Sequence, residues 1–196
     1  MSSRALIVAL LCAAVAGGCA KAPPVPADVF FRLPDPRPVA GAQLTDAAIV
    51  VRALRADGLR SERALLYVDD AADVTLQQQH YHFWAESPPR LVQAQLIQYL
   101  RLAGASPMVI GGTDAPAELV VSGRLRRFER RLSGEQAAVV EIELQLERDG
   151  HGLVLVRDYA AEVPAGEGFD SAIAAFAEAL DKIFADFLAD ARASLR

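Results

Sequence analysis

The sequence predicts a single α+β domain, in which a largely antiparallel β-sheet packs against two amphipathic helices. Three observations predict it. Apolar residues recur at helical spacing in two segments, and short apolar, partly β-branched runs precede and separate these segments. Two turn signals divide residues 119–159 into a meander. The length of 196 residues fits one domain.

Four strands are expected before the first helix. The first, 30–33, stops at Pro34, because proline has no amide hydrogen to donate to a neighbouring strand. Two further runs, 47–54 and 64–69, are apolar and partly β-branched. Segment 74–84 is more polar, and as a strand it would carry glutamines on its outer face.

The two helices have recognisable ends. Ser87 is expected to cap the first helix, prolines occupy its first turn, and Gly104 and Pro107 end it. The second helix covers about 170–193. Its apolar stripe consists of Ile173, Phe176, Leu180, Ile183, Phe184, Phe187 and Leu188.

A meander is expected between the helices, after a short strand at 108–111. Ser133-Gly134 would form a two-residue turn that pairs Leu132 with Glu135, and Asp149-Gly150 a second turn that leads into 153–159. This register places Arg124 opposite Glu143, Leu125 opposite Ile142 and Arg126 opposite Glu141.

Five arginines crowd the first strand of this meander. Alone, they would suggest a site for phosphate or acidic lipid, but the register pairs Arg124 and Arg126 with glutamates in ordinary cross-strand charge pairs. Arg127, Arg130 and Arg131 are left unpaired by it, and they are the candidates for binding an anionic partner.

The composition argues against several classes of function. Lys and Arg number 20 against 25 Asp and Glu, a net charge of −5 that argues against nucleic acid as the main partner. His80 and His82 could share a metal with Glu86, but no further ligand lies near them, so a structural or surface role is favoured. No G-x-S-x-G, P-loop or H-E-x-x-H motif occurs. We therefore predict no catalytic residues, no metal site, no cofactor and no enzyme.

The N-terminus has the features of an exported lipoprotein. Arg4 is followed by the uncharged run 5–16 and by Gly17-Gly18-Cys19, which resembles a lipobox with Ala16 in place of the usual Leu. We predict that residues 1–18 are a signal peptide and that Cys19 is lipidated. The alternative is an ordinary signal peptide, cut nearby, that leaves Cys19 as a free thiol.

The lipobox implies a sorting signal and a short tether. Ala20, rather than Asp, at the next position implies export to the inner leaflet of the outer membrane. Residues 19–27 would form the lipidated N-terminus and a proline-rich tether that reaches only about 25 Å, with acyl chains as a lasting anchor. The folded domain would then cover 28–196.

Phe30 and Phe31 follow the tether directly. In a strand they face opposite sides, so only one of them can enter the core. The other either packs on the closing helix or lies exposed at a surface that binds a partner.

The order of three motifs resembles a known family. Cys19, then Phe30-Phe31-Arg32-Leu33, then Trp84-Ala85-Glu86-Ser87-Pro88-Pro89 before an amphipathic helix is similar to the ABC-type transport auxiliary lipoproteins, the family of the paraquat-inducible intermembrane-transport lipoprotein. Most members have Tyr-Tyr where this chain has Phe-Phe. The resemblance covers the whole chain after the signal peptide.

The resemblance implies an accessory of an MCE-type ABC lipid-transport system that supports envelope integrity. An MCE-domain protein would be the partner, and a homo-oligomeric ring is an arrangement that the resemblance allows. A scaffold or assembly lipoprotein that binds an outer-membrane protein or the cell wall is the second hypothesis, and a lipid-anchored hydrolase is the third.

Overall fold

The computed structural model describes residues 24–41, 43–70, 72, 74–112 and 116–196. The elements follow one another in the order β1 (Val29–Phe31), β2 (Ala48–Val51), the 3-10 helix η1 (Gly58–Ser61), β3 (Ala64–Val68), β4 (Leu76–Trp84), α2 (Pro88–Ala103), β5 (Met108–Gly111), β6 (Leu119–Arg131), β7 (Ala137–Arg148), β8 (Gly152–Pro164) and α3 (Phe169–Ser194). The predicted strands and helices are thus all present among the described residues.

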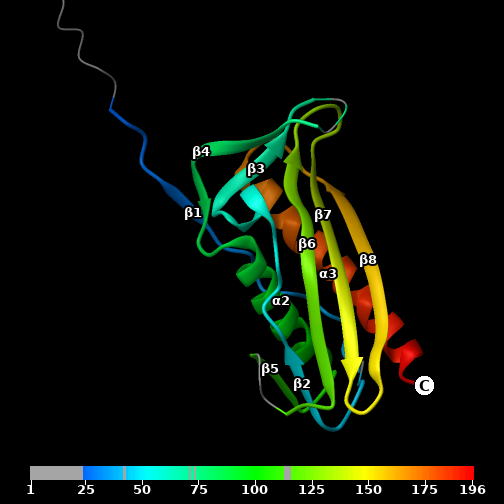
Figure 1. Cartoon of the computed structure of the whole chain (residues 1–196). Coiled ribbons are helices and arrows are strands. Elements are labelled where there is room, and N and C mark those ends of the chain that lie inside the picture. Colours follow the sequence, from blue (N-terminus) through cyan, green and yellow to red (C-terminus); the bar gives the residue numbers. More distant parts are fainter. Residues whose placement is uncertain (1–23, 42, 71, 73, 113–115) are drawn as a thin grey trace, which may run out of the picture.

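All eight strands belong to one mixed sheet, and β6 lies at its centre (Figure 1). One edge of β6 pairs with β2 near its start and with β3 near its end, both parallel. Its other edge forms the antiparallel meander β6–β7–β8. The α+β class and the largely antiparallel sheet are confirmed, with parallel pairings also at β1–β4 and β2–β5.

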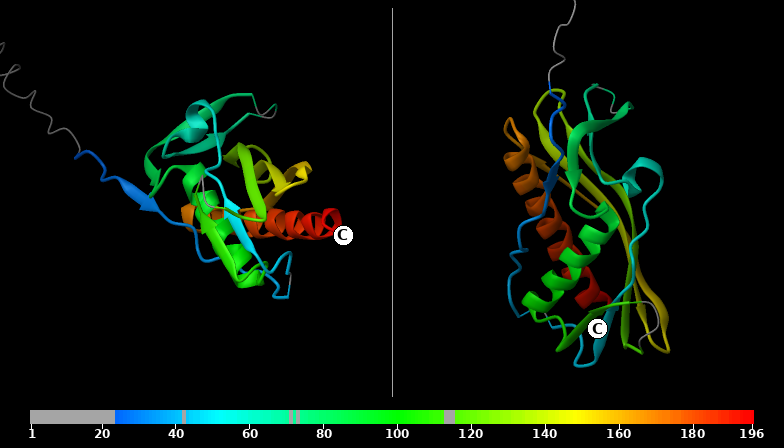
Figure 2. Two further views of the ribbon diagram at one scale, coloured as in Figure 1. Left: turned by 60° about the horizontal axis from the view of Figure 1, so that its bottom comes forward. Right: turned by 90° about the vertical axis from the view of Figure 1, so that its left-hand side faces the viewer.

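Both helices cover the same face of the sheet (Figure 2). α3 packs on β7 and β8, and α2 packs on β5 and contacts α3. We call the covered side the inner face and the opposite side the outer face. The inner core contains an aromatic cluster in which Trp84 lies 5.1 Å from Phe128 and 5.4 Å from Phe176, measured between ring centroids.

The ends of α2 follow from local chemistry. Ser87 has the extended backbone of an N-cap, although its side chain donates and accepts no capping hydrogen bond. Gly104 adopts the left-handed conformation at φ 73°, and its N–H donates to the carbonyl oxygens of Leu100 and Arg101. The predicted boundaries of α2 are confirmed. No helix in the described ranges is long and apolar enough to cross a membrane.

The predicted register of the first hairpin is correct along most of β6 and wrong near the turn. Arg124 lies opposite Glu143 and Leu125 opposite Ile142, but a bulge at Arg126 then places Arg127, not Arg126, opposite Glu141. Arg131 pairs with Ala137, so the turn is longer than two residues.

The bulge has a packing reason. Without an extra residue, strict alternation would direct Arg127 to the inner face and Phe128 to the outer face. The bulge reverses this order, and Phe128 packs at only 1% exposure between Trp84 and Phe176. Arg130, two residues further along β6, consequently also lies on the inner face.

Candidate functional site

A hollow on the outer face surrounds Phe30. Because Phe30 pairs with Phe83 across β1 and β4, both rings project to the same side, and Phe30 remains 53% exposed. The hollow has a volume of about 440 Å³, and we call it the Phe30 hollow. Its walls are formed by Asp28, Phe30, Glu62, Arg63, Ala64, Gln78 and Phe83.

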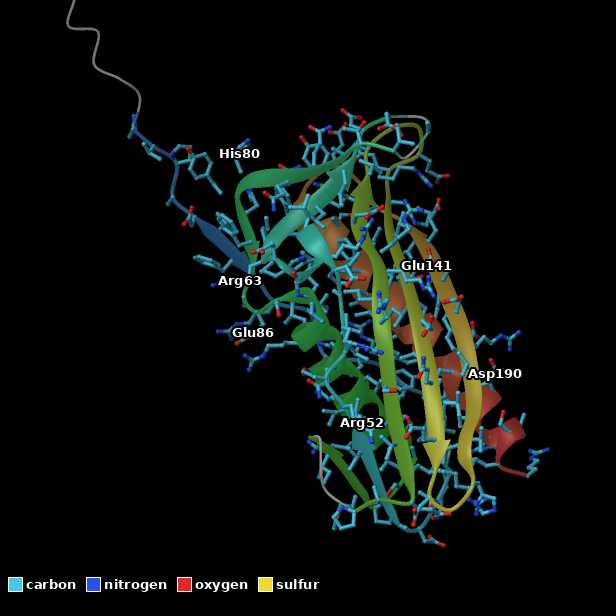
Figure 3. The ribbon with its side chains drawn as sticks, viewed as in Figure 1. Arg52, Arg63, His80, Glu86, Glu141 and Asp190 are labelled. Carbon is cyan, nitrogen blue, oxygen red and sulfur yellow. The ribbon has the colours of Figure 1, made fainter. Side chains whose placement is uncertain are left out.

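The hollow combines two aromatic rings with the positively charged side chain of Arg63, which is fixed in position by its contacts. The ring centroids of Phe30 and Phe83 lie 5.7 Å apart. The guanidinium carbon of Arg63 lies 5.0 Å from the centroid of Phe30, in the geometry of a cation–π contact. Arg63 Nε also donates to the carbonyl oxygen of Trp84 at 3.0 Å, which fixes the side chain beside β1 (Figure 3). An exposed aromatic ring with a positioned arginine is typical of protein-binding surfaces.

A distortion of β4 borders the hollow. The pairing of β3 with β4 jumps from Ala64–Phe83 to Leu66–Gln78, so β4 carries several extra residues there. Tyr81 lies in this bulge at φ 62°, a conformation that costs a non-glycine residue free energy, and its side chain is exposed. His80 projects from the same part of β4, toward the end where the N-terminal segment leaves the domain (Figure 3).

Phe31 lies on the inner face, in an aromatic stack with the start of α3. It pairs with Trp84, and its ring centroid lies 5.4 Å from that of Phe169, the first residue of α3. His82 stacks on Phe169 at 4.0 Å, and the guanidinium of Arg130 lies over Phe169 at 5.0 Å. We call these four residues the inner stack. The prediction that the two phenylalanines face opposite sides is confirmed.

The prediction that Arg127, Arg130 and Arg131 are unpaired is wrong for two of them. Arg127 Nε donates to Glu129 Oε1 at 2.8 Å, and Arg131 forms an ion pair with Glu162. The hydrogen bond from Arg131 holds the pKa of Glu162 below its ordinary value. The bulge causes the difference, since it reverses the faces on which these residues project.

The other two arginines form charge pairs, but with different partners. Arg124 lies opposite Glu143 as predicted, yet its side chain binds Asp57 at 2.6 Å. Arg126 forms ion pairs with Glu143 and, at 3.0 Å, with Asp158. Glutamate and aspartate on the exposed outer face therefore neutralise both arginines, and this part of β6 offers no free basic patch.

The two histidines of β4 are joined by a hydrogen bond. A carbonyl oxygen only accepts, so the 2.8 Å contact between His82 Nδ1 and the carbonyl of His80 places a proton on Nδ1. No group of three or more potential metal-ligating side chains occurs within the described ranges.

The predicted lipidation and sorting residues, Cys19 and Ala20, lie outside the residues that the structure describes.

Sequence reasoning missed Arg63, Phe83 and Phe169 as site residues. Phe83 reaches the hollow through its parallel pairing with Phe30, which lies 53 positions earlier in the chain, and no local pattern indicates this contact. Phe169 lies one residue before the predicted start of the closing helix. Its aromatic character at a helix start was the available signal.

Comparison with known families gives one match. Residues 31–187 match the family model described as ABC-type transport auxiliary lipoprotein component. Comparison with curated proteins gives no match.

Several solved structures are similar in fold. A Xanthomonas campestris protein of the DUF330 family superposes with a TM-score of 0.73 at 16% identity, over 85% of this chain and 96% of its own. An uncharacterized protein gives a TM-score of 0.64 at 15% identity, over 87% of this chain and 100% of its own. A hypothetical protein from Chlamydia trachomatis gives 0.50 at 8% identity, over 77% and 98% of the two chains.

Proposed function

This chain belongs to the family of ABC-type transport auxiliary lipoprotein components, and on that premise we propose that it is an accessory of an MCE-type ABC lipid-transport system at the outer membrane. It would face the periplasm and bind an MCE-domain protein, and through this role it would support envelope integrity. The family is a transport auxiliary family and not an enzyme family.

The anchor in this proposal is Cys19. Residues 1–18 would be removed, Cys19 would carry the acyl chains, Ala20 would direct export to the inner leaflet of the outer membrane, and 28–196 would form the domain. The domain's first strand starts at Val29, so about ten residues separate it from the acylated cysteine. At about 3.1 Å per residue in a proline-rich segment, β1 lies within about 30 Å of the membrane surface.

The exposed ring of Phe30 is the observation that carries the partner-binding part of the proposal. A large aromatic side chain that is half exposed leaves apolar surface in water, and burial against a partner recovers that free energy. The partner would insert an apolar side chain between Phe30 and Phe83, and Arg63 and Glu62 at the margin would bind its polar groups. Arg127 and Arg131, as ion-paired residues, would contribute less than the sequence suggests.

The free edge of β8 supports a homo-oligomer. Among the described strands β8 pairs only with β7, so one side of a strand that covers Gly152–Pro164 has backbone groups without a strand partner. Leu153 and Val156 on this strand are both exposed. A second copy that covered this edge would satisfy the backbone groups and bury the apolar residues, and repetition of the contact would build a ring.

Co-purification tests the proposal. The detergent-extracted lipoprotein should retain an MCE-domain protein, and a Phe30→Ala variant should retain much less of it at equal expression. A Cys19→Ala variant should leave the membrane fraction. Absence of any MCE protein from the wild-type complex, together with an unchanged envelope after deletion of the gene, would contradict the proposal. Crosslinks to an outer-membrane barrel or to the cell wall would favour a scaffold lipoprotein instead.

A further inference from the structure

Arg130 is a buried cation without a counter-ion in the described part of the chain. It is only 6% exposed, and no hydrogen bond or ion pair joins it to a described residue. The neighbouring carboxylates are occupied: Glu129 binds Arg127, and Glu162 binds Arg131. None of the Arg130 side-chain nitrogens is both fully buried and without a hydrogen-bond partner, so the guanidinium still contacts solvent.

This arrangement is costly unless an anion joins it. Partial withdrawal of a guanidinium from water is unfavourable when no carboxylate compensates the charge. The cation–π contact with Phe169, at 5.0 Å, offsets only part of that cost. Burial lowers the pKa of Arg130, but an arginine remains charged in proteins. Among the described residues, the Arg130 charge therefore has an aromatic contact but no counter-ion.

A second source of positive potential lies at the same place. α3 begins at Phe169, whose ring contacts the Arg130 guanidinium, and the N-cap residue Gly168 has no side chain to bind the first amides. Ser171 Oγ accepts from the N–H of Gly166 instead. Asp170 lies in the first turn, but it forms no ion pair with Arg130. The free amides and the helix dipole favour an anion at this end of α3.

We propose that Arg130 and the first turn of α3 bind the phosphate group of a phospholipid. The planar guanidinium matches phosphate oxygens in a bidentate geometry, and the amides of the first turn supply further donors. The rings of Phe31 and Phe169 beside it would contact the apolar part of the lipid. The choice of a phospholipid over free phosphate rests on the proposed function in lipid transport.

NMR titration of the full-length, detergent-extracted protein in a maltoside detergent tests the site. One arm adds inorganic phosphate and the other adds dihexanoylphosphatidylglycerol, and both follow the Nε–H signal of Arg130 and the amide of Phe169. Arg130→Met removes the charge and keeps the apolar stem. Arg126→Met is the matched control, because Arg126 lies on the same strand in the exposed bulge and pairs with Glu143 on the outer face.

The short-chain lipid should shift both signals in the wild type and in Arg126→Met, and Arg130→Met should bind it at least about tenfold more weakly. Arg130→Met should unfold at a temperature no lower than that of the wild type without ligand. If Arg130→Met does not fold, Arg130→Lys should still bind the lipid several-fold more weakly than the wild type, since lysine keeps the charge but lacks the paired N–H donors of the guanidinium.

Three results would overturn the proposal. The first is equal lipid affinity of Arg130→Met and the wild type. The second is binding of inorganic phosphate without binding of the lipid. The third is a lower thermal midpoint for Arg130→Met together with a wild-type midpoint that neither phosphate nor lipid raises. Failure to co-purify an MCE protein would contradict the proposed function alone, because the titration needs no partner.

Discussion

Phe30 and Phe31 are adjacent residues that should respond oppositely to the same substitution. Phe30 is 53% exposed on the outer face, whereas Phe31 packs on the inner face against Phe169 and His82. Phe30→Ala should therefore weaken partner binding with little effect on folding. Phe31→Ala should lower the free energy of unfolding and serves as the matched control.

The size of the binding effect follows from the exposed surface. A phenylalanine side chain offers roughly 200 Å², so a ring that is about half exposed leaves about 100 Å² for a partner to cover. At about 25 cal/mol per Å² this burial contributes about 2.5 kcal/mol, which corresponds to about a 60-fold weaker Kd for Phe30→Ala. Phe31 is half-buried, so Phe31→Ala should cost about 2 kcal/mol of stability, below the range for a fully buried ring.

Two measurements decide the matter. Biolayer interferometry with immobilised MCE protein gives the Kd of each detergent-extracted variant, and urea denaturation gives the free energy of unfolding. We expect Phe30→Ala to change stability by less than about 1 kcal/mol, because the ring is about half exposed and its contacts with Phe83 and Arg63 lie at the surface. The reasoning is refuted if Phe30→Ala binds within threefold of the wild type, or if it destabilises the fold as much as Phe31→Ala.

Three further substitutions test the packing and the charges of the meander and its neighbours. Gly123→Ala would place a Cβ atom 2.3 Å from the carbonyl oxygen of Glu143, so urea denaturation should show a loss of about 3 kcal/mol, and a loss under 0.5 kcal/mol would contradict the contact. Glu129→Gln removes a carboxylate that is 2% exposed and bound to Arg127; we expect a loss of about 3 kcal/mol, and an unchanged urea midpoint would disprove a structural role. Backbone N–H groups of the following loop lower the pKa of Asp70 in the folded protein, so its contribution to stability is present above about pH 4 and disappears as the pH falls through the lowered value. Asp70→Asn should flatten the pH dependence of the thermal midpoint in that range, and an unchanged profile would count against this assignment.

The helices were predictable from the sequence because their signals are local. The spacing of apolar residues, the prolines after Ser87 and the glycine at 104 act within a few turns of each other, and the boundaries of α2 agree with them. The alternation of β7 and the Asp149-Gly150 turn are local as well, so the meander was predictable in outline. The split of Phe30 and Phe31 needed only the two-residue period of a strand.

The bulge at Arg126 shows where local reasoning ends. Nothing near it in the sequence distinguishes it from the arginines on either side. Its cause is Phe128, which must reach Trp84 and Phe176 on elements distant in the chain. That one displacement determined which arginines bind glutamates and left Arg130 on the inner face.

By itself the sequence determined the fold class, both helices, the succession of the strands along the chain, the resemblance to a lipoprotein family and the opposite orientation of Phe30 and Phe31. Only the tertiary structure decided that Phe30 is the exposed one and that Arg130 has no counter-ion among the described residues. Helix spacing and turn residues act over a few residues, so they can be recognised locally. The exposure and ion pairing of a side chain depend on strands that pair across long separations, as β1 does with β4 and β3 with β6.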